Sequence, residues 1–457
     1  MVCEKLCGAA AAALMLIGCS SAPSQGADEL RLVVLDPGHF HAALVQRTSL
    51  DGVSDTVKVF APEGAGVEQY LANIERFNHR AEEPAQWVEE VYTGADFFER
   101  FLAEKQGDIV VLAGNNQKKT HYIVEAIRAG YHVLADKPLA ITSEDFALLD
   151  EAYRLAEERG VVLYELMTER YDTLNIIEKE LLAVEPLFGV LTTGSTEKPA
   201  IELESVHHFF KEVNSTPLIR PVWYYDVRQQ GEGIADVTTH LIDLVQWQCF
   251  PDAAIRYPEE VSVTAATHWP TRIEFEDFVR STNECCYPDY LAPYVKNGVL
   301  EVNANGEIDF VVRGVHASMR VIWNYQAPAG SGDTFTSVKR GTKAELHTVQ
   351  DASTGFKKEL YLVKAEGVAE ELFDKEVATA VAALQPKYDF LAAEKCGEGR
   401  YLVVIPSEVR TGHEAHFGKV AAAFLDYVRG AEMPASERAN TIAKYHVTTK
   451  AVELANK

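Results

Sequence analysis

Residues 108–138 read DIVVLAGNNQKKTHYIVEAIRAGYHVLADKP. The apolar run at 108–113 predicts a buried strand, and a helical pattern at 119–129 and a second apolar run at 132–135 follow it. A strand, a helix and a strand in this order are typical of a βαβ unit with two parallel strands.

The same alternation continues on both sides of this unit. Upstream, apolar runs at 30–35 and 57–60 predict two more strands. Downstream, residues 142–145 (TSED) form a capping-box pattern before a helix, and another strand is predicted at 161–165. We therefore predict an α/β fold in which residues 29–165 form a doubly wound parallel sheet, a Rossmann dinucleotide-binding domain.

A glycine turn follows the first predicted strand. In the register of G-x-G-x-x-G, Asp36 and His41 replace the outer glycines, and Gly38 keeps the middle one. The middle glycine lets a pyrophosphate approach the backbone, so we predict that Gly38, His39 and Phe40 bind the cofactor. A carboxylate at Asp36 would repel phosphates. The alternative is therefore a protein that kept this fold and lost its cofactor.

Three further residues are candidates for cofactor binding. Glu63 follows the second strand, where an acidic residue holds the ribose hydroxyls and favours NAD over NADP. Asn115 and Asn116 follow the strand at 108–113, and their amides can bond a ribose or close a turn. The alternative for Glu63 is a solvated turn residue.

Residues 231–247 read GEGIADVTTHLIDLVQW, a glycine-rich loop that runs into a helix. At about 100° per residue, Asp236, His240, Asp243 and Trp247 fall on one stripe of that helix. A carboxylate one turn from an imidazole can orient it and raise its pKa, an arrangement suited to general acid/base catalysis. The alternative is a surface helix that begins at Asp236.

Residues 205–228 concentrate histidine, basic and aromatic side chains just before this helix. Such groups suit a sugar, which has apolar CH faces and hydroxyl edges, although a packed aromatic hairpin would have the same composition. We take as candidate substrate residues His207, His208, Lys211, Arg220 and Trp223, together with His413 near the C-terminus.

Alternating runs at 261–268, 307–313 and 317–323 predict an antiparallel sheet. We expect residues 166–457 to form the substrate and oligomerisation domain, ending in a helical extension. Within that extension, His413-Glu-Ala-His416 lacks the i,i+4 spacing of a zinc-binding H-E-x-x-H pair, so no metal site is predicted.

Asn115, His121, residues 129–139 and residues 231–247 together resemble the Gfo/Idh/MocA (glucose–fructose oxidoreductase / inositol dehydrogenase) family. The resemblance implies a Rossmann domain followed by an α/β domain with a large, open, mostly antiparallel sheet. Members of that family usually have Glu-Lys-Pro where this chain has Asp136-Lys137-Pro138. The C-terminal part resembles an extension found in a lipoprotein subgroup of oxidoreductases.

The resemblance also implies roles for the candidate residues. Lys137 would lie beside the nicotinamide of NAD, with NADP left open, and His240 would move the proton of a sugar hydroxyl. Asp236 would orient His240 or bind a substrate hydroxyl. A lysine with a lowered pKa and a histidine can share such a proton. The family also commonly forms homo-oligomers through the second sheet.

The first residues predict export. Residues 1–18 resemble a lipoprotein signal peptide that ends in a lipobox, with Cys19 as the lipidated residue and residues 19–28 as a tether; an ordinary secretory signal is the alternative. We expect a periplasmic or outer-membrane lipoprotein that contacts the membrane only through its anchor. A net charge of −25 argues against nucleic-acid binding.

These observations favour an NAD(P)-dependent oxidoreductase that acts on a sugar or glycoside hydroxyl. Because an exported enzyme meets little free NAD, we expect a tightly bound cofactor that is recycled. Two alternatives stay open, namely a redox-neutral NAD-dependent glycosidase or lyase and a non-catalytic carbohydrate-binding lipoprotein.

Overall fold

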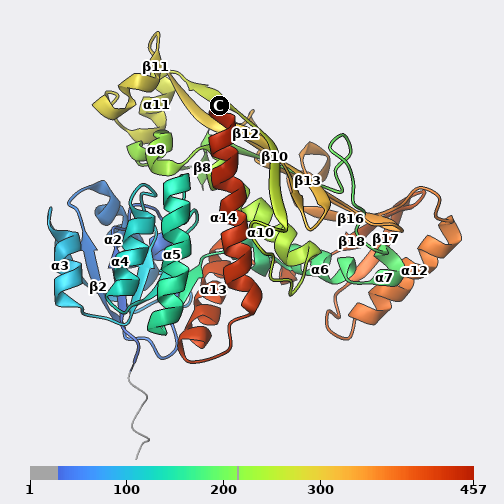
Figure 1. Cartoon of the computed structure of the whole chain (residues 1–457), viewed down its shortest axis with the longest axis horizontal. Coiled ribbons are helices and arrows are strands. Elements are labelled where there is room, and N and C mark those ends of the chain that lie inside the picture. Colours follow the sequence, from blue (N-terminus) through green and yellow to red (C-terminus); the bar gives the residue numbers. More distant parts are fainter. Residues whose placement is uncertain (1–28, 214–215) are drawn as a thin grey trace, which may run out of the picture.

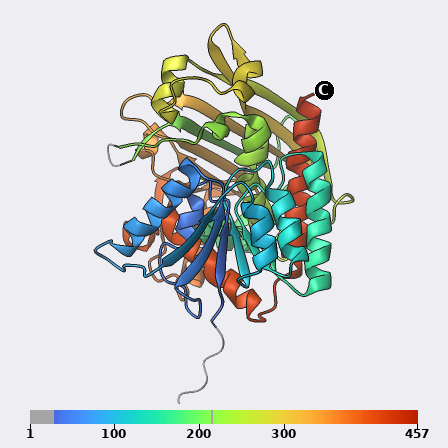
Figure 2. The same ribbon diagram turned by 90° about the vertical axis from the view of Figure 1, so that its left-hand side faces the viewer.

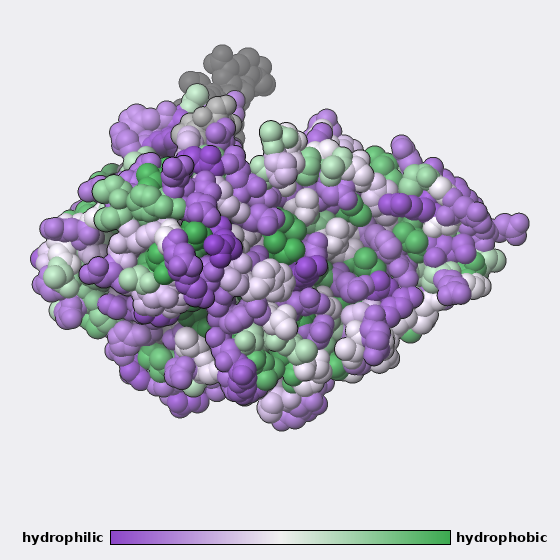
Figure 3. Space-filling model, turned by 90° about the horizontal axis from the view of Figure 1, so that it is seen from above, coloured by the Kyte–Doolittle hydropathy of each residue, from purple (hydrophilic) through white to green (hydrophobic). Residues whose placement is uncertain are grey.

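The computed structural model describes residues 29–213 and 216–457, and two α/β domains lie side by side in it (Figure 1). The predicted signal peptide, Cys19 and the tether lie outside the described residues. Most of the visible surface is hydrophilic, in keeping with the strong negative charge (Figure 3). Among the described helices, none has the length and apolar character needed to cross a membrane.

The first domain is built on six parallel strands in the order β3-β2-β1-β4-β5-β6, which is the Rossmann order. The prediction of a doubly wound parallel sheet is confirmed. The central strands are continuous apolar runs because helices cover both faces of the sheet (Figure 2). The strands are β1 (Leu32–Leu35), β2 (Thr56–Ala61), β3 (Val88–Thr93), β4 (Ile109–Leu112), β5 (His132–Ala135) and β6 (Leu163–Glu165).

Helices α1 and α2 pack on one face of this sheet, and α3, α4 and α5 pack on the other. The predicted capping box is present, since Thr142 accepts from the backbone N–H of Asp145 and the Asp145 side chain accepts from that of Thr142. The helices are α1 (His41–Val45), α2 (Ala65–Asn78), α3 (Phe97–Glu104), α4 (Lys119–Arg128) and α5 (Ser143–Arg159).

The second domain carries a large sheet in the order β10-β12-β13-β7-β14-β15-β16-β18-β17, with β11 paired to β12. Its described strand pairs are antiparallel except for β13 with β7, as expected. The strands are β7 (Ile201–Phe210), β10 (Val261–Ile273), β11 (Val295–Lys296), β12 (Val299–Val312), β13 (Val315–Gln326), β14 (Thr334–Arg340), β15 (Ala344–Gln350), β16 (Glu359–Lys364), β17 (Ala392–Gly397) and β18 (Arg400–Val404).

Helices cover one face of this sheet: α10 lies over β7, β12 and β13, and α6 and α12 lie over β15 and β16. A short hairpin of β8 (Glu212–Val213) and β9 (Thr216–Pro217) stands apart. The helices are α6 (Thr173–Leu182), α7 (Glu185–Phe188), α8 (Val227–Gln230), α9 (Gly233–Asp236), α10 (Thr238–Cys249), α11 (Phe275–Thr282) and α12 (Glu370–Leu384).

The C-terminal extension is shared between the domains. Helix α13 (His413–Val428) inserts Phe417, Phe424 and other apolar side chains into the core beside α1 and α2. Helix α14 (Ala435–Ala455) stands between the domains and packs on both α5 and α10 (Figure 1). The two terminal helices therefore complete the Rossmann core and hold it against the second domain.

A buried polar cluster fixes α14 in this position. Lys444 is fully buried, and its Nζ lies 2.6 Å from Glu165 Oε2 of β6 and 3.0 Å from Asp243 Oδ1 of α10. The Arg170 guanidinium donates a hydrogen bond to each carboxylate oxygen of Asp243, both at 2.7 Å. The Tyr445 hydroxyl donates to Glu165 and accepts from the backbone N–H of Leu139 at 2.7 Å. Charges from three segments neutralise one another where water is excluded.

Replacing Lys444 by Met should destabilise the protein by about 3–5 kcal/mol, because Glu165 and Asp243 would stay buried without this cation. Urea unfolding followed by circular dichroism measures the change. Lys450→Met, on a partly exposed part of the same helix, is the matched control and should shift stability by less than about 0.5 kcal/mol. Equal midpoints for the two variants would contradict this account of α14.

Candidate active site

Lys137 and Asp236 meet across the domain boundary. Lys137 follows β5 at the carboxyl end of the Rossmann sheet, and Asp236 is the last residue of α9 in the second domain. Lys137 Nζ lies 2.5 Å from Asp236 Oδ1, and both side chains are mostly buried. The predicted helix at 231–247 is divided at Val237 into α9 and α10, although Val237 keeps a helical conformation.

This pairing sets the charge of both groups. Burial opposes the ammonium form of Lys137, but Asp236 and Asp136 outweigh it, so the pKa of the lysine is raised. Burial likewise opposes the Asp236 carboxylate, but Lys137 outweighs it and lowers the pKa of the acid. The expectation of a lysine with a lowered pKa at position 137 is therefore wrong, and the pair is ionised at neutral pH.

His240 lies one turn beyond Asp236 and faces the same cavity. Its Nδ1 is buried and has no hydrogen-bond partner among the described residues. Burial and then the charge of Lys137 lower the pKa of His240 to about 4. Glu169 and Asp236 do raise this pKa, but burial and Lys137 outweigh them, so the expectation of a raised His240 pKa is wrong. Asp243 does not share the cavity, since it belongs to the cluster around Lys444.

A second lysine near the site was missed in the sequence. Lys119 is buried at the start of α4, with Nζ 2.5 Å from Asn116 Oδ1 and 2.9 Å from the backbone oxygen of Asp136. Burial lowers the pKa of Lys119 to about 8. Its one signal was the spacing Asn116-x-x-Lys119, which places both side chains on one side of a helix start.

The glycine turn has the geometry of a dinucleotide-binding loop despite its substitutions. Asp36 adopts φ +50°, a left-handed conformation that aspartate tolerates better than most residues. Burial raises the pKa of Asp36, and its carboxyl group is bonded by Tyr122. A Cβ on Gly114 would lie 2.2 Å from the backbone oxygen of Asp36, so only glycine allows this close contact between β1 and β4.

At Gly38 the turn is closely packed, since the backbone N–H of Gly38 donates to the Asp36 oxygen at 2.8 Å and that of His39 donates to the Ala113 oxygen at 3.1 Å. A Cβ on Gly38 would meet Gly114 Cα, Asn115 N and Trp223 Nε1, each at 3.6 Å. The indole N–H of Trp223 is a hydrogen-bond donor placed over the turn, where it suits a phosphate oxygen. The Trp223 indole therefore supplies a donor that fits a pyrophosphate at this turn, and Trp223 is not among the residues that line the substrate cavity.

The other cofactor candidates differ in their surroundings. Asn115 donates to Gln229 Oε1 at 2.6 Å, and Asn116 donates to the backbone oxygen of Gln230 at 2.8 Å. Both asparagines thus bridge the crevice to the second domain. Glu63 is exposed just after β2, at the end of the strand where a ribose is held in Rossmann domains.

A cavity of about 550 Å³ lies between the domains. Of the predicted substrate residues, His207, Lys211, Arg220 and His413 line it. His208 is buried behind the wall, where its Nδ1 lies 2.8 Å from Asp333 Oδ1. His413 Nε2 lies 3.3 Å from Thr168 Oγ1.

Three charged residues of the cavity wall had no motif in the sequence that predicted them: Glu169, Asp333 and Lys358. Lys358 Nζ lies 2.9 Å from Glu169 Oε2, and Lys211 pairs with Asp333. Burial opposes the carboxylate of Glu169, but Lys358 outweighs it and holds the pKa of that acid well below its usual range. Cations and carboxylates alternate around the cavity, so it offers donors and acceptors in neighbouring positions.

Two family descriptions match the chain. Residues 38–166 match an oxidoreductase family with an NAD-binding Rossmann fold, and residues 177–456 match the family described as "Putative oxidoreductase C terminal domain". No curated protein matches the chain. A crystal structure of a "putative oxidoreductase" from Parabacteroides merdae is 46% identical, with a TM-score of 0.93 over 94% of this chain and 98% of that chain.

More distant solved structures share the fold. Levoglucosan dehydrogenase in complex with NADH and levoglucosan is 15% identical, with a TM-score of 0.58 over 94% of this chain and 97% of that chain. A 3-ketoreductase from Actinomadura kijaniata in complex with NADP is 15% identical, with a TM-score of 0.52 over 91% of this chain and 95% of that chain.

His240 should stay neutral down to about pH 5, because its pKa is about 4. Lys137→Met should raise that pKa, since the lysine charge disfavours the imidazolium. Titration of isotopically labelled histidines by NMR, with His240→Gln to assign the signal, measures both values. Lys395→Met, on the far strand β17, is the control and should leave the signal unchanged. A His240 pKa near 6.5 in the unmodified protein would contradict this electrostatic picture.

Proposed function

Because the chain belongs to the Gfo/Idh/MocA oxidoreductase family and carries its NAD-binding Rossmann domain, we propose that it transfers hydride between NAD(P) and a hydroxyl-bearing carbon of a neutral sugar or glycoside. One observation carries the proposal. The Lys137–Asp236 pair and the unpartnered Nδ1 of His240 line one cavity at the carboxyl edge of the Rossmann sheet, where ligands of this fold bind.

The dinucleotide would be held along this edge. The backbone at Gly38, His39 and Phe40 and the indole N–H of Trp223 would face the pyrophosphate, and Glu63 would bond the ribose. When bound, the cofactor supplies the hydride acceptor or donor. Glu63 favours NAD, because a carboxylate disfavours a 2′-phosphate.

The protein's own residues would handle the proton. His240 is neutral at pH 7, so it can accept the hydroxyl proton of the substrate as the carbon is oxidised. The Lys137 ammonium would donate a hydrogen bond to the same oxygen and stabilise the negative charge that develops on it. Asp236 would keep Lys137 charged and fixed in place.

The cavity supports a neutral, hydroxyl-rich substrate. Lys137, Lys211 and Lys358 each pair with a carboxylate in the cavity wall, so these three charges are already neutralised. Arg220 also lines the cavity and donates to the backbone oxygens of Phe209 and His208. Trp323 stacks on His207 with ring centroids 4.9 Å apart and adds an aromatic surface for a sugar CH face. Levoglucosan dehydrogenase, a protein of the same fold, also acts on an uncharged sugar derivative.

Cellular location bears on how the cofactor is used. We propose that Cys19 is lipidated and that the protein is anchored in the periplasm or outer membrane. Such a protein would carry its cofactor out in the folded state and regenerate it within one reaction cycle. Oxidation and re-reduction of the same sugar, as in NAD-dependent glycosidases, would meet this need.

Protein purified without added nucleotide should release a nicotinamide dinucleotide when denatured, and mass spectrometry of the filtrate identifies NAD or NADP.

A second candidate function is a carbohydrate-binding protein without cofactor, which the Asn115–Gln229 bridge across the crevice favours. That reading would gain support from protein that releases no dinucleotide and shows no calorimetric heat with millimolar NAD or NADP.

His240→Ala should lower turnover about 10²–10⁴-fold while cofactor binding persists, because it removes the proton acceptor and nothing that holds the dinucleotide. The assay follows bound nicotinamide absorbance with a panel of neutral glycosides. His347→Ala is the matched control, since His347 lies on β15 and bonds Glu345 away from the cavity. Turnover within about threefold of wild type in His240→Ala would overturn the assignment.

A further inference from the structure

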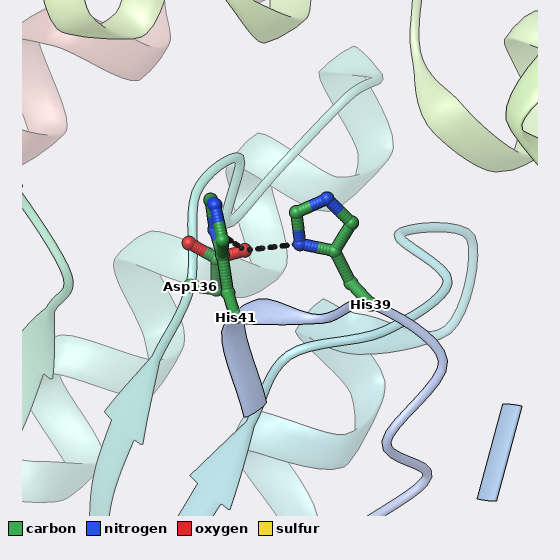
Figure 4. A group of neighbouring side chains, drawn as sticks. All are labelled: His39, His41 and Asp136. Atoms are coloured by element: carbon green, nitrogen blue, oxygen red, sulfur yellow. Dashed lines mark hydrogen bonds and ion pairs between the residues drawn. The ribbon is translucent and has the colours of Figure 1, made fainter. Parts of the chain in front are cut away.

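Three metal-ligating side chains converge below the glycine turn. His39 comes from the turn, His41 is the first residue of α1, and Asp136 follows β5 (Figure 4). Each offers one ligand atom, and these atoms lie within 4.8 Å of one another. In the proposed hydride transfer Asp136 only helps to keep Lys137 charged, and the two histidine side chains have no role, so their convergence calls for its own explanation.

His41 is hydrogen-bonded to Asp136, whereas His39 lies at the separation expected for two ligands of one ion. His41 Nδ1 lies 2.9 Å from Asp136 Oδ2, and His39 Nδ1 lies 3.4 Å from the same oxygen. Ligands about 2.1 Å from a tetrahedral ion stand roughly 3.4 Å apart. The two imidazole rings lie edge to face, with centroids 4.1 Å apart and an angle of 78° between their planes.

Hydrogen bonding alone leaves the cluster incomplete. His39 Nδ1 is buried, and its contact with Asp136 fails the geometry of a regular hydrogen bond, so it has no such partner among the described residues. A buried ring nitrogen with only this long ion-pair contact is poorly satisfied, and a ligand would satisfy it better. A metal ion would take the lone pair of this nitrogen together with those of His41 and Asp136.

We propose that His39, His41 and Asp136 bind a divalent transition-metal ion of the zinc type. Two imidazoles and one carboxylate suit such an ion, whereas Mg²⁺ and Ca²⁺ prefer oxygen ligands throughout. Three protein ligands leave a coordination position open, which is the pattern of catalytic and not of structural zinc sites.

The open position would face the substrate cavity. His39 and His41 both line that cavity, next to Lys137. His413 also borders it, with its ring centroid 5.8 Å from that of His41. The ion would therefore hold water, or an oxygen of the bound sugar, within the same chamber as Lys137 and His240. This site adds a second means of orienting the substrate, independent of the nicotinamide.

The surroundings of Asp136 would keep its carboxylate in position. The backbone oxygen of Asp136 accepts from Lys119 Nζ at 2.9 Å, and Lys119 is itself held by Asn116. His41 packs against Phe417 of α13, with ring centroids 4.7 Å apart. Such supporting contacts orient metal ligands in established sites.

The full-length mature protein, stripped with chelator and dialysed, tests the proposal by calorimetric titration with ZnCl₂ and by elemental analysis. We expect one zinc ion per chain. His41→Ala and Asp136→Asn should each weaken binding at least about 10–100-fold, the loss that even supporting residues cause at metal sites. His121→Ala, at an exposed residue of α4, is the matched control and should bind zinc as wild type does.

Circular dichroism checks that each variant is folded, and Asp136→Asn keeps the shape of the side chain if His41→Ala does not fold. Anomalous diffraction at the zinc edge then locates the ion. A peak within about 2.3 Å of His39, His41 and Asp136 supports the site. No binding at millimolar zinc, equal affinity in wild type and Asp136→Asn, or a peak elsewhere would overturn it. Because the readout is metal binding, failure here leaves the nicotinamide proposal standing.

Discussion

The ion pair between Lys137 and Asp236 is the contact on which the site depends. It joins the carboxyl edge of the Rossmann sheet to the end of α9, and both charges are mostly buried. Either charge alone in this position would be costly, so each domain fixes a residue that the other requires. Burial and the charge of Lys137 together keep the His240 imidazole neutral.

The C-terminal helices hold the domains that carry Lys137 and Asp236 in a fixed position relative to one another. Helix α14 spans the domain boundary, with Lys444 neutralising Glu165 of the Rossmann domain and Asp243 of α10. Asp243 and His240 lie on the same helix, so the cluster around Lys444 also fixes the direction in which His240 points. A movement between the domains would break both buried clusters, which favours a rigid cavity over a hinged one.

Much of the fold could be predicted from local pattern. The parallel sheet follows from apolar runs that alternate with amphipathic helices, and the capping box at Thr142 is purely local. Lys137, Asp236 and His240 could be singled out because their motifs are short and contiguous. Helix α13 could not be assigned to the Rossmann core, because no feature of residues 413–428 indicates which sheet they pack against.

The electrostatics could not be predicted, because pKa values depend on which partners meet. Sequence spacing put Asp236 beside His240, but a lysine 99 residues away takes the carboxylate instead. Asp333, Glu169 and Lys358 enter the cavity from separate segments with no shared motif. The cluster of His39, His41 and Asp136 escaped notice for the same reason, since Asp136 is 95 residues from His41.

In the proposed function, the crevice over Gly38 and the cavity beside Lys137 form one continuous site for a nicotinamide dinucleotide and a sugar. A crystal structure of the protein grown with NAD and a neutral glycoside tests it most directly. The account predicts pyrophosphate density across Gly38 beneath Trp223, with the nicotinamide ring in the cavity next to Lys137 and a sugar hydroxyl within hydrogen-bond reach of His240. A crevice that stays closed by Asn115 and Gln229 at saturating NAD, with the dinucleotide absent or bound elsewhere, would contradict it.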